Sequence, residues 1–529
     1  MTARFAALVL PEPERKAFLE TVRAQVSPEH FERIQAMTEA FPELVALLDE
    51  RGMSLARLRR VAFGAPTEKT ATVCPPTEAA SPLKTAPRRK RKGHGRHGAH
   101  AYTGARRVPV SHPTLKPGQT CPACAKGKLY RQPRPAPAIR VEAQPPVTAT
   151  VFEKEVLRCH LCGKTFTAPT PAQAGMQKYD PTVGIMVGLL RYGGGLPFYR
   201  LERWQGSLGV PLAASTQWEL VEGVARVVRP VGDHLAFLAA QSPTVFNDDT
   251  TMRVSELRRQ IQAEPQPERT GIFTTGIVAN AQEQPIALFF TSRQHAGENL
   301  DAVLRQRQAD LPPPLQMCDG LSRNEPQEFK TILGGCLVHG RRAFVEVAPN
   351  FPDECRHVLE SLRTVYRFEA QAKADGLNPE ARLKFHQTYS QPVLEELQSW
   401  LQNQFTEKRV EPNSSLGQAI NYMLRHWQPL TLFLRRPGAP LDNNICERAL
   451  KMAILHRKNS LSYKTQRGAQ VGDLFMSLIH TCRLNRANPF DYFMALVGHS
   501  KEVLAHPGQW LPWNFRDALA TVTPVTNTS

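Results

Sequence analysis

Acidic residues stand in this sequence where a chain can gather carboxylates around divalent cations. Asp248 and Asp249 end the stretch VFNDD, Asp319 follows LQMC, and Glu447 lies in DNNICERALK. Phosphodiester cleavage and strand transfer need a hydroxyl activated and a leaving oxygen stabilised, which two Mg²⁺ ions about 3.5–4 Å apart can do with carboxylate ligands. Singly, these acids could be a turn residue, a loop-starting Asp-Gly and a surface ion-pair partner. Only the joint arrangement of Asp248, Asp319 and Glu447 predicts a magnesium site.

The elements that carry these acids are predicted from residue patterning. In the expected strands apolar residues alternate with polar ones or form short runs, and in the expected helices apolar residues recur every three or four positions. Asp442 or Asn443 is expected to cap the helix that holds Glu447. The order is a strand with an acid (242–250), a hairpin (271–280 and 284–292), a helix (296–308), a strand with an acid (314–320) and a helix with an acid (442–455). An RNase H-like fold places its active-site carboxylates in this order.

Basic residues near these acids in sequence suit a phosphate backbone. CLVHGRR supplies Arg341 and Arg342, and the HRK run supplies Arg457 and Lys458. The alternative, surface ion pairs with nearby acids, fits the HRK run least. We therefore expect these four residues to bind DNA.

Two cysteine pairs have the spacing of a zinc site. CPAC contains Cys121 and Cys124, and CHLC contains Cys159 and Cys162, with 34 residues between the pairs. Four thiolates can bind one tetrahedral Zn²⁺, and a glycine after each pair can aim backbone N–H groups at the sulfurs. A redox dithiol would need only one pair within a βαβ pattern. The spacing predicts a structural zinc ribbon over 111–170, in which alternating residues before Cys159 suggest a strand pair.

A basic segment without acids precedes the cysteine pairs. Residues 84–107 hold nine Lys or Arg and three His. Such a segment cannot bury a core and is a linker, a localisation-like run or an arm that follows phosphates in a salt-sensitive manner. We favour the arm, whose expected DNA-binding residues are Arg88, Arg89, Lys90, Arg91 and Lys92.

Composition supports a polyanionic partner and a reducing compartment. The 529 residues carry a net charge of +18, and the pI is about 9.6. This balance favours nucleic acid as partner and makes a metal-dependent enzyme of small molecules a poorer reading. No apolar run is long enough to span a bilayer, and the N-terminus lacks a signal-peptide layout. We expect a cytoplasmic, nucleoid-associated protein whose cysteines are thiols or metal ligands.

The chain is expected to be a multidomain α/β protein. A short apolar stripe (Ile34, Met37, Phe41, Leu44, Leu47, Leu48) marks a small helical domain or a self-association helix. Residues 182–228 are expected to form successive helices, and 196–224 within them outline either a helix-turn-helix or an ordinary helical pair. The expected domains are a helical N-terminus (1–63), a basic Pro/Gly-rich linker (64–110), the ribbon (111–170), a helical segment (171–240), an RNase H-like catalytic domain (241–470) with a helical insertion at about 350–435, and a C-terminal helical segment and tail (471–529).

The ordered motifs together resemble a transposase of the insertion-sequence 66 family. The resemblance covers nearly the whole chain and is far more specific than any one motif. It is carried by RRKRKGHGR, CPAC with CHLC, NDDTTMRV, QMCDG, CLVHGRR, DNNICERALK, HRKNSL and LIHTCRLNRANPFDYF.

This resemblance implies a DDE transposase that acts with Mg²⁺ on the terminal inverted repeats of an insertion sequence and on target DNA. It also implies a zipper-like N-terminal segment, a homo-oligomer on DNA and accessory proteins from the same element. The family's Asp-Glu-Thr pattern falls on Asp248-Asp249-Thr250, which makes Asp248 the ligand and Asp249 a departure. Cys336 and His339 match a C-x-x-H feature whose role stays open. The alternatives are a catalytically silent, transposase-derived zinc-ribbon DNA-binding protein and a plain nuclease of the same fold.

Overall fold

The structure is a computed structural model that describes most of the chain. Met37, Phe41, Leu44, Leu47 and Leu48 of the N-terminal stripe lie outside the described residues, as do Cys159 and the whole run 88–92 of the basic arm. The described residues are 12–23, 25–32, 34–35, 38, 70–73, 99–101, 105, 107–133, 136–139, 141, 145–158, 160, 162, 164–175, 177–264, 269–281 and 283–522.

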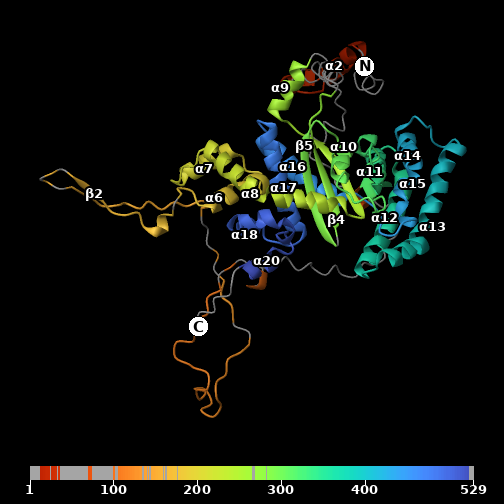
Figure 1. The fold of residues 1–529 in the computed structure, drawn as a ribbon. Helices are drawn as coiled ribbons and strands as arrows, with labels where there is room; N and C mark the ends of the chain where they lie inside the picture. Colours follow the sequence, from red (N-terminus) through yellow and green to blue (C-terminus); the bar gives the residue numbers. More distant parts are fainter. Residues whose placement is uncertain are drawn as a thin grey trace. The chain divides into compact units, whose positions relative to one another are not determined.

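A mixed five-stranded sheet forms the centre of one compact unit, which comprises residues 78–339, 371–392 and 422–529. The strands lie in the order β5-β4-β3-β6-β7, and Figure 1 shows this sheet with β4 and β5 labelled. β3, β4 and β5 are antiparallel neighbours, whereas β6 runs parallel to β3 and β7 parallel to β6. Their bounds are β3 Thr244–Thr251, β4 Phe273–Ala281, β5 Gln284–Ser292, β6 Leu315–Cys318 and β7 Ile332–Gly335.

The predicted order of acid-bearing elements is confirmed at the level of secondary structure. β3 carries the first aspartates, β4 and β5 form the hairpin, and β6 ends directly before Asp319. The predicted helices are α10 (Ala296–Leu304) and α16 (Asn444–Ser460), the second of which carries Glu447. The residue patterning missed α9 (Ser255–Ala263) and the strand β7.

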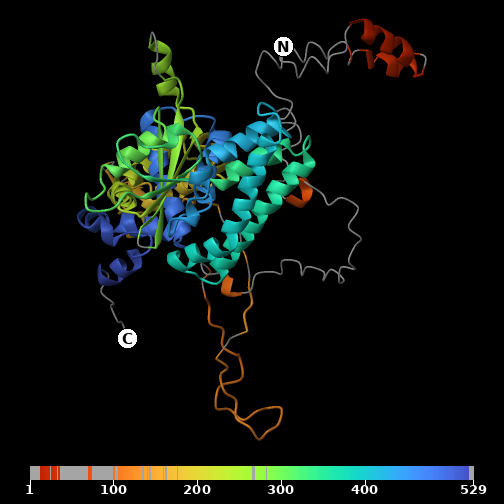
Figure 2. The same cartoon turned by 90° about the vertical axis from the view of Figure 1, so that its right-hand side faces the viewer.

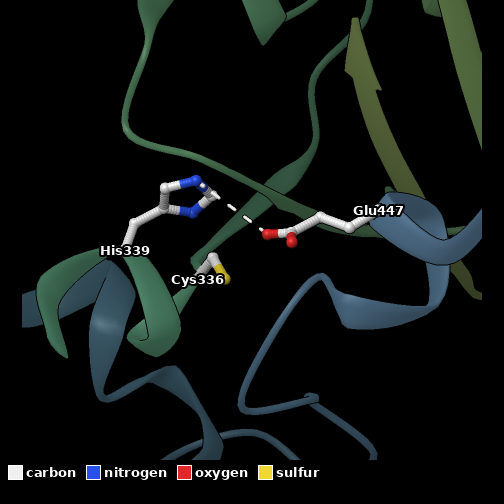
Figure 3. A group of neighbouring side chains, drawn as sticks. All are labelled: Cys336, His339 and Glu447. Carbon is white, nitrogen blue, oxygen red and sulfur yellow. Dashed lines mark ion pairs between the residues drawn. The ribbon is translucent and has the colours of Figure 1, made fainter. Parts of the chain in front are cut away.

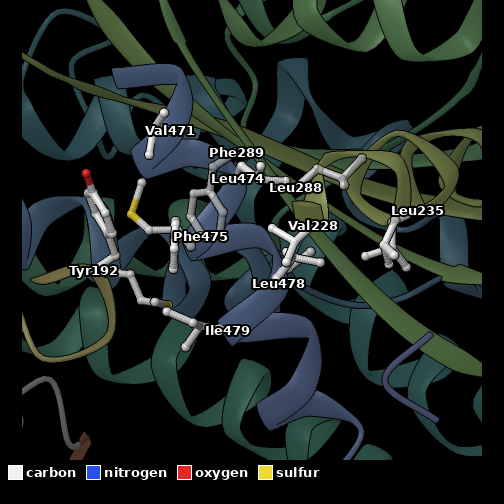
Figure 4. Packing of buried hydrophobic residues seen from close by; sticks show 14 of the residues in the cluster. Tyr192, Val228, Leu235, Leu288, Phe289, Val471, Leu474, Phe475, Leu478 and Ile479 are labelled. Atoms are coloured by element: carbon white, nitrogen blue, oxygen red, sulfur yellow. The ribbon is translucent and has the colours of Figure 1, made fainter. Parts of the chain in front are cut away.

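Helices α8 (Ala214–Ala240) and α17 (Gln466–Leu484) supply much of the core around the sheet. One face of α8, which includes Val228 and Leu235, is fully buried, and so is Phe475 of α17. Figure 4 shows these side chains packed beside Leu288 of β5. Because a Cβ at Gly232 would stand 2.4 Å from Leu474 Cδ1, glycine allows the two helices this close approach.

Helix α17 also covers the edge of the sheet. Its residues Asp473, Ser477 and Thr481, spaced four apart, accept hydrogen bonds from the outward N–H groups of Thr291, Phe289 and Ala287 at 2.7, 3.0 and 3.1 Å. These N–H groups belong to β5, whose outer side has no strand partner among the described residues. An uncovered edge exposes N–H and C=O groups to pairing with other chains. One polar face of α17 thus takes the place of a sixth strand.

The segment between β2 and β3 is helical. It contains α6 (Pro181–Gly188), the π-helical segment η3 (Leu189–Gly193), α7 (Phe198–Ser207) and α8. A turn at Gly209, with φ 76°, joins α7 to α8. Since buried side chains run along the whole of α8, an ordinary helical pair accounts for this outline, and a helix-turn-helix stays a prediction.

The other compact unit comprises residues 1–77, 340–370 and 393–421, so the predicted insertion at 350–435 is divided between both units. Within it, His357 and Trp400 have ring centroids 4.5 Å apart, and Leu362, Leu401 and Ile420 are fully buried. The helices that pass through this part of the chain are α11 Leu337–Val347, α12 Pro352–Ala374, α13 Pro379–Thr406 and α14 Ser415–Arg425.

The remaining elements are short, and most of them lie near the ends of the described chain. Figure 2 shows the same elements after a rotation of 90° about the vertical axis of Figure 1. No helix among the described residues is long and apolar enough to cross a membrane. The remaining bounds are α2 Glu12–Arg23, α5 Thr70–Val73, η1 Ala99–Ala101, β1 Val156–Arg158, β2 Thr165–Thr167, η2 Ala172–Ala174, η4 Ser322–Asn324, α15 Trp427–Leu430, η5 Leu432–Leu434, α18 Pro489–Gly498, α19 Ser500–Ala505, η6 Pro507–Gln509 and α20 Phe515–Val522.

We predict that Ser477→Ala lowers the free energy of unfolding by about 1–3 kcal/mol, because it leaves the N–H of Phe289 buried without an acceptor. Urea unfolding followed by circular dichroism measures this change. Ser207→Ala is the matched control, since the Ser207 hydroxyl is exposed and donates only to Trp204 in its own helix. Equal effects of the two substitutions would contradict the role given to the edge contact.

Candidate active site

The pairing of β3 with β6 brings the first two predicted acids to one end of the sheet. Phe246 pairs with Met317 in the parallel register. Two residues further along each chain stand Asp248 and Asp319, the second just past the end of β6. Neighbouring strands lie about 4.8 Å apart. Continuing the register therefore sets these carboxylates side by side although 71 residues separate them.

Asp248 lies on the face of the sheet that α16 covers. In the antiparallel pair of β3 and β4 it stands opposite Gly276. A Cβ at Gly276 would meet Leu450 Cδ2 at 3.0 Å and Cys446 Sγ at 3.4 Å, both on α16. Directly paired residues point to the same face of a sheet. The glycine therefore leaves room for α16 beside Asp248.

Asp249 points to the opposite face, because successive strand residues alternate. Its side chain is only 1% exposed and lies 3.0 Å from His295 Nδ1 and 3.4 Å from an Arg323 nitrogen. These partners hold the second aspartate in an ion-pair cluster away from α16. The geometry supports the prediction that Asp248, and not Asp249, is the acid that acts with Glu447.

Two hydrogen bonds fix the start of α16 against the strands. Asn443 donates its side-chain N–H to the Asn247 carbonyl at 3.0 Å, and the Cys446 thiol donates to the Gly276 carbonyl at 3.2 Å. Asn443 therefore makes no side-chain cap, and the Asp442 carboxylate accepts the N–H of Asn444 at 3.1 Å instead. Of the two expected capping residues, Asp442 is the one that bonds the helix end.

The pKa of Asp248 is raised because the carboxylate is buried and other acids lie near it. Burial, and next the charge of Asp319, raise the pKa of Asp248 to about 7, with further contributions from Asp249 and Glu447. A hydrogen bond of 2.8 Å from the Asp249 N–H opposes this rise. Glu447 Oε1 is buried without a hydrogen-bond partner among the described residues. Gathered carboxylates with an unpartnered oxygen fit a hard divalent cation, which supplies the missing positive charge.

Side-chain amides orient the second acid. Asn324 donates to Asp319 Oδ1, and the Leu321 N–H donates to the same oxygen at 3.3 Å. The Asn324 carbonyl accepts in turn from Asn247 at 2.7 Å and from Gln316 at 2.8 Å. This network ties the loop after β6 to β3, so the positions of the first and second acids depend on each other.

Tyr422 and His426 lie beside the acids and were missed by the sequence reasoning. A Cβ at Gly320 would stand 3.1 Å from the Tyr422 hydroxyl and 3.2 Å from His426 Cε1. Burial, and next the charge of Asp319, raise the pKa of Tyr422 to about 12. Both residues lie in a stretch of ordinary helical patterning, which carries no signal for this contact.

Cys336 and His339 lie next to the third acid, as Figure 3 shows. Cys336 follows β7, and His339 lies in the first turn of α11. Their ligand atoms and a Glu447 carboxylate oxygen all lie within 4.8 Å of one another, and His339 Nε2 is 3.9 Å from Glu447 Oε1. Burial raises the pKa of the Cys336 thiol to about 11. The C-x-x-H spacing therefore has a structural counterpart at this site.

The predicted DNA-binding residues have different surroundings. Arg457 donates hydrogen bonds to the Thr250 hydroxyl at 3.1 Å and the Thr251 hydroxyl at 2.6 Å, and also to the Thr251 carbonyl, so its guanidinium braces the end of β3. Lys458 is exposed. Arg341 and Arg342 are half-buried and belong to the unit of residues 1–77, 340–370 and 393–421, which does not contain Asp248, Asp319 or Glu447. Binding of DNA by these four residues stays a prediction.

The first cysteine pair has the local geometry that zinc knuckles use. The Gly127 N–H donates to Cys124 Sγ at 3.5 Å. Hydrogen bonds from the Gly127 and Lys126 backbone, with one from Cys121, lower the pKa of Cys124. Cys162 of the second pair lies between β1 and β2, so one strand of the expected pair follows the second cysteine motif and does not precede it. The knuckle at Gly127 supports the zinc prediction for this half of the ribbon.

Fold and site together define a mixed α/β domain that gathers carboxylates at one end of its sheet. The family model described as Transposase IS66 family matches residues 179–471, more than half of the chain, and the chain belongs to this family. Membership gives it a transposase role, and with that role DNA as partner and a general use of divalent cations.

Relatives in Sinorhizobium fredii (strain NBRC 101917 / NGR234) match much of the length. "Uncharacterized protein y4jD" is 26% identical over 511 residues, covering 89% of this chain and 95% of the relative. "Uncharacterized protein y4hP" is 25% identical over 434 residues, covering 77% and 75%. The similarity therefore extends beyond the segment matched by the family model.

We predict that Asp248→Asn stabilises the cation-free protein at pH 8 more than at pH 5, by about 1–3 kcal/mol. A folded pKa of about 7 exceeds the unfolded value, so the stabilising contribution of the bound proton is complete below pH 4 and is lost as pH rises through 7. Urea unfolding in Mg²⁺-free buffer at both pH values measures the difference.

Addition of Mg²⁺ at pH 8 should then stabilise the unmodified protein and leave the variant nearly unchanged. An equal effect of the substitution at both pH values would refute the placement of Asp248 in a crowded acidic cluster.

Proposed function

We propose that this protein is a DDE transposase, which catalyses Mg²⁺-dependent DNA cleavage and strand transfer at the ends of an insertion sequence. The observation that carries the proposal is the electrostatic coupling of Asp248 to both Asp319 and Glu447 at one end of the sheet. Acids so far apart in sequence come together only through the fold, and their mutual repulsion is offset when cations bind between them.

The order of the strands supports an RNase H-like core. Three antiparallel strands are followed by two that run parallel to the first, and the first strand lies at the centre of the sheet. The first acid stands on the central strand, the second just past its neighbour β6, and the third on the helix packed across them. We infer that this is the catalytic domain, with helices inserted between β7 and α16.

The residues of the chain have distinct duties in the proposed reaction. Asp248, Asp319 and Glu447 would hold two Mg²⁺ ions, which, when bound, polarise the scissile phosphate and favour an attacking hydroxyl. Asn324 and the Leu321 N–H keep the Asp319 carboxylate oriented. Asn443 keeps the start of α16 against β3, so that Glu447 stays within reach of the other two acids. Tyr422, beside Gly320, limits the space around Asp319.

Recognition of DNA is assigned to the parts of the chain before the catalytic domain and to exposed basic residues. A Zn²⁺ ion held by Cys121, Cys124, Cys159 and Cys162 would fold the ribbon, and the basic arm would follow the phosphates of the element's ends. Exposed Lys458 lies in the last turn of α16, roughly 16 Å along the helix from Glu447, where it would contact a phosphate further along the bound DNA.

We predict that Glu447→Gln lowers the rate of Mg²⁺-dependent cleavage of end DNA by about 10²-fold or more, because a metal ligand is worth several kcal/mol of barrier. Cleavage is measured on labelled terminal repeats, and binding of the same DNA by gel shift should change little. Glu328→Gln is the matched control, since Glu328 forms an exposed ion pair with Arg305.

Unchanged cleavage by the Glu447→Gln variant would refute the role of this residue. Loss of DNA binding and of cleavage together would point to misfolding. Absence of cleavage by the unmodified chain, with binding intact, would leave a catalytically silent DNA-binding protein.

A further inference from the structure

We propose that Cys336, His339 and Glu447 form a separate site for a soft divalent cation of the zinc class, and that its occupation withdraws Glu447 from the Mg²⁺ ligands. Binding at this site is independent of the chemistry proposed above. Its regulatory consequence rests on the proposed function, because it requires Glu447 to serve catalysis.

The geometry of the three ligand atoms is close to that of a zinc site. Sγ of Cys336, a ring nitrogen of His339 and a carboxylate oxygen of Glu447 lie within 4.8 Å of one another. Tetrahedral zinc, with bonds of about 2.0–2.3 Å, sets its ligand atoms roughly 3.5 Å apart. Small side-chain rotations would close this difference. Three protein ligands leave one position open, as in catalytic or exchangeable zinc sites.

Two polar atoms of this cluster make no hydrogen bond to the described part of the chain that metal binding would have to break. His339 Nδ1 and Glu447 Oε1 are both buried without a hydrogen-bond partner among the described residues. A buried polar atom without a partner destabilises the protein, and a cation between the two side chains would give Oε1 a partner. The His339 and Glu447 side chains are each 26% exposed, so a cation can reach them from solvent.

One main-chain N–H group already bonds the sulfur of Cys336, although burial keeps the thiol protonated until a metal displaces the proton. The Asn443 N–H donates to its Sγ at 3.3 Å, which is the kind of bond that stabilises a metal-bound sulfur. On binding, the thiol would release its proton to solvent as the metal–sulfur bond forms. The backbone that directs this N–H belongs to the same turn that starts α16, so the sulfur and Glu447 are positioned together.

The chemistry of the donors selects the cation. Thiolate and imidazole favour zinc-class ions, whereas Mg²⁺ takes oxygen ligands and avoids sulfur. Asp248 and Asp319 offer only oxygen ligands. A hard cation is therefore held by Asp248, Asp319 and Glu447, and a soft cation by Cys336, His339 and Glu447, with the single Glu447 carboxylate drawn to whichever cation is bound.

Cobalt titration of the full-length chain, dialysed against a weak chelator so that exchangeable metal is removed and the tightly held ribbon zinc is kept, tests the site without relying on activity. Co²⁺ bound to a thiolate gives a near-ultraviolet charge-transfer absorption. We expect one Co²⁺ equivalent with this absorption in the unmodified chain, its loss in Cys336→Ser, and its retention in the control Cys482→Ala, whose cysteine is buried in α17. Because any exchange into the ribbon occurs in all three proteins, the difference between spectra isolates Cys336. Identical spectra of the unmodified chain and Cys336→Ser would overturn the proposal.

Zinc inhibition tests the sharing of Glu447. The ratio of Mg²⁺-dependent cleavage with and without micromolar Zn²⁺ is compared within each protein, so differences in basal rate cancel. We expect Zn²⁺ to slow the unmodified chain by about tenfold or more and the Cys336→Ser variant by less than about twofold. Equal inhibition of both proteins would overturn the shared-ligand inference. If Glu447→Gln cleaves as fast as the unmodified chain, the proposed function fails, and the cobalt titration still decides whether the metal site exists.

Discussion

Repulsion between like charges is the constraint on which the acidic end of the sheet depends. Burial, and next the charge of Asp319, raise the pKa of Asp248 to about 7, with a smaller contribution from Glu447. Such a cluster persists only where packing and hydrogen bonds overdetermine it. Here α16 is held by bonds from Asn443 and Cys446 to the main chain of two strands, and the hydrophobic core under the sheet supplies the free energy that keeps it there.

The two faces and the edge of the sheet each make different contacts that hold the acidic residues in place. The α16 face presents Asp248, while the other face buries Asn247 and Asp249 in bonds to Asn324 and His295. Alternation along one strand thus lets neighbouring residues serve chemistry and support. At the edge, side chains of α17 accept hydrogen bonds from the outer N–H groups of β5, so this edge is not available for pairing with another chain.

Local patterning was sufficient to predict the acid-bearing elements but not the contacts between distant segments. Alternating apolar residues ending in an acid identified β3 and β6, and spacing alone indicated the cysteine pairs. β7 was missed because two of its four residues are glycines; a Cβ at Gly335 would stand 3.2 Å from Leu430 Cδ2, so close packing, not strand propensity, selects glycine there. Tyr422 was missed for a similar reason, since its hydroxyl is near Asp319 only through the fold.

Glu447 lies near the carboxylates at the end of the sheet and also near the sulfur of Cys336, which follows β7, and the imidazole of His339 on α11. Its charge contributes to the raised pKa of Asp248, and its Oε1 lies 3.9 Å from His339 Nε2. The backbone of α16 is fixed by Asn443, whose side chain bonds Asn247 and whose N–H bonds Cys336. Asn443 therefore ties the start of α16 both to β3 and to the Cys336 thiol. Under the two proposals above, a movement of the Glu447 side chain, with no movement of the helix, would change which donor set is complete, and the identity of the bound cation would then control the acidic cluster without any rearrangement of the core.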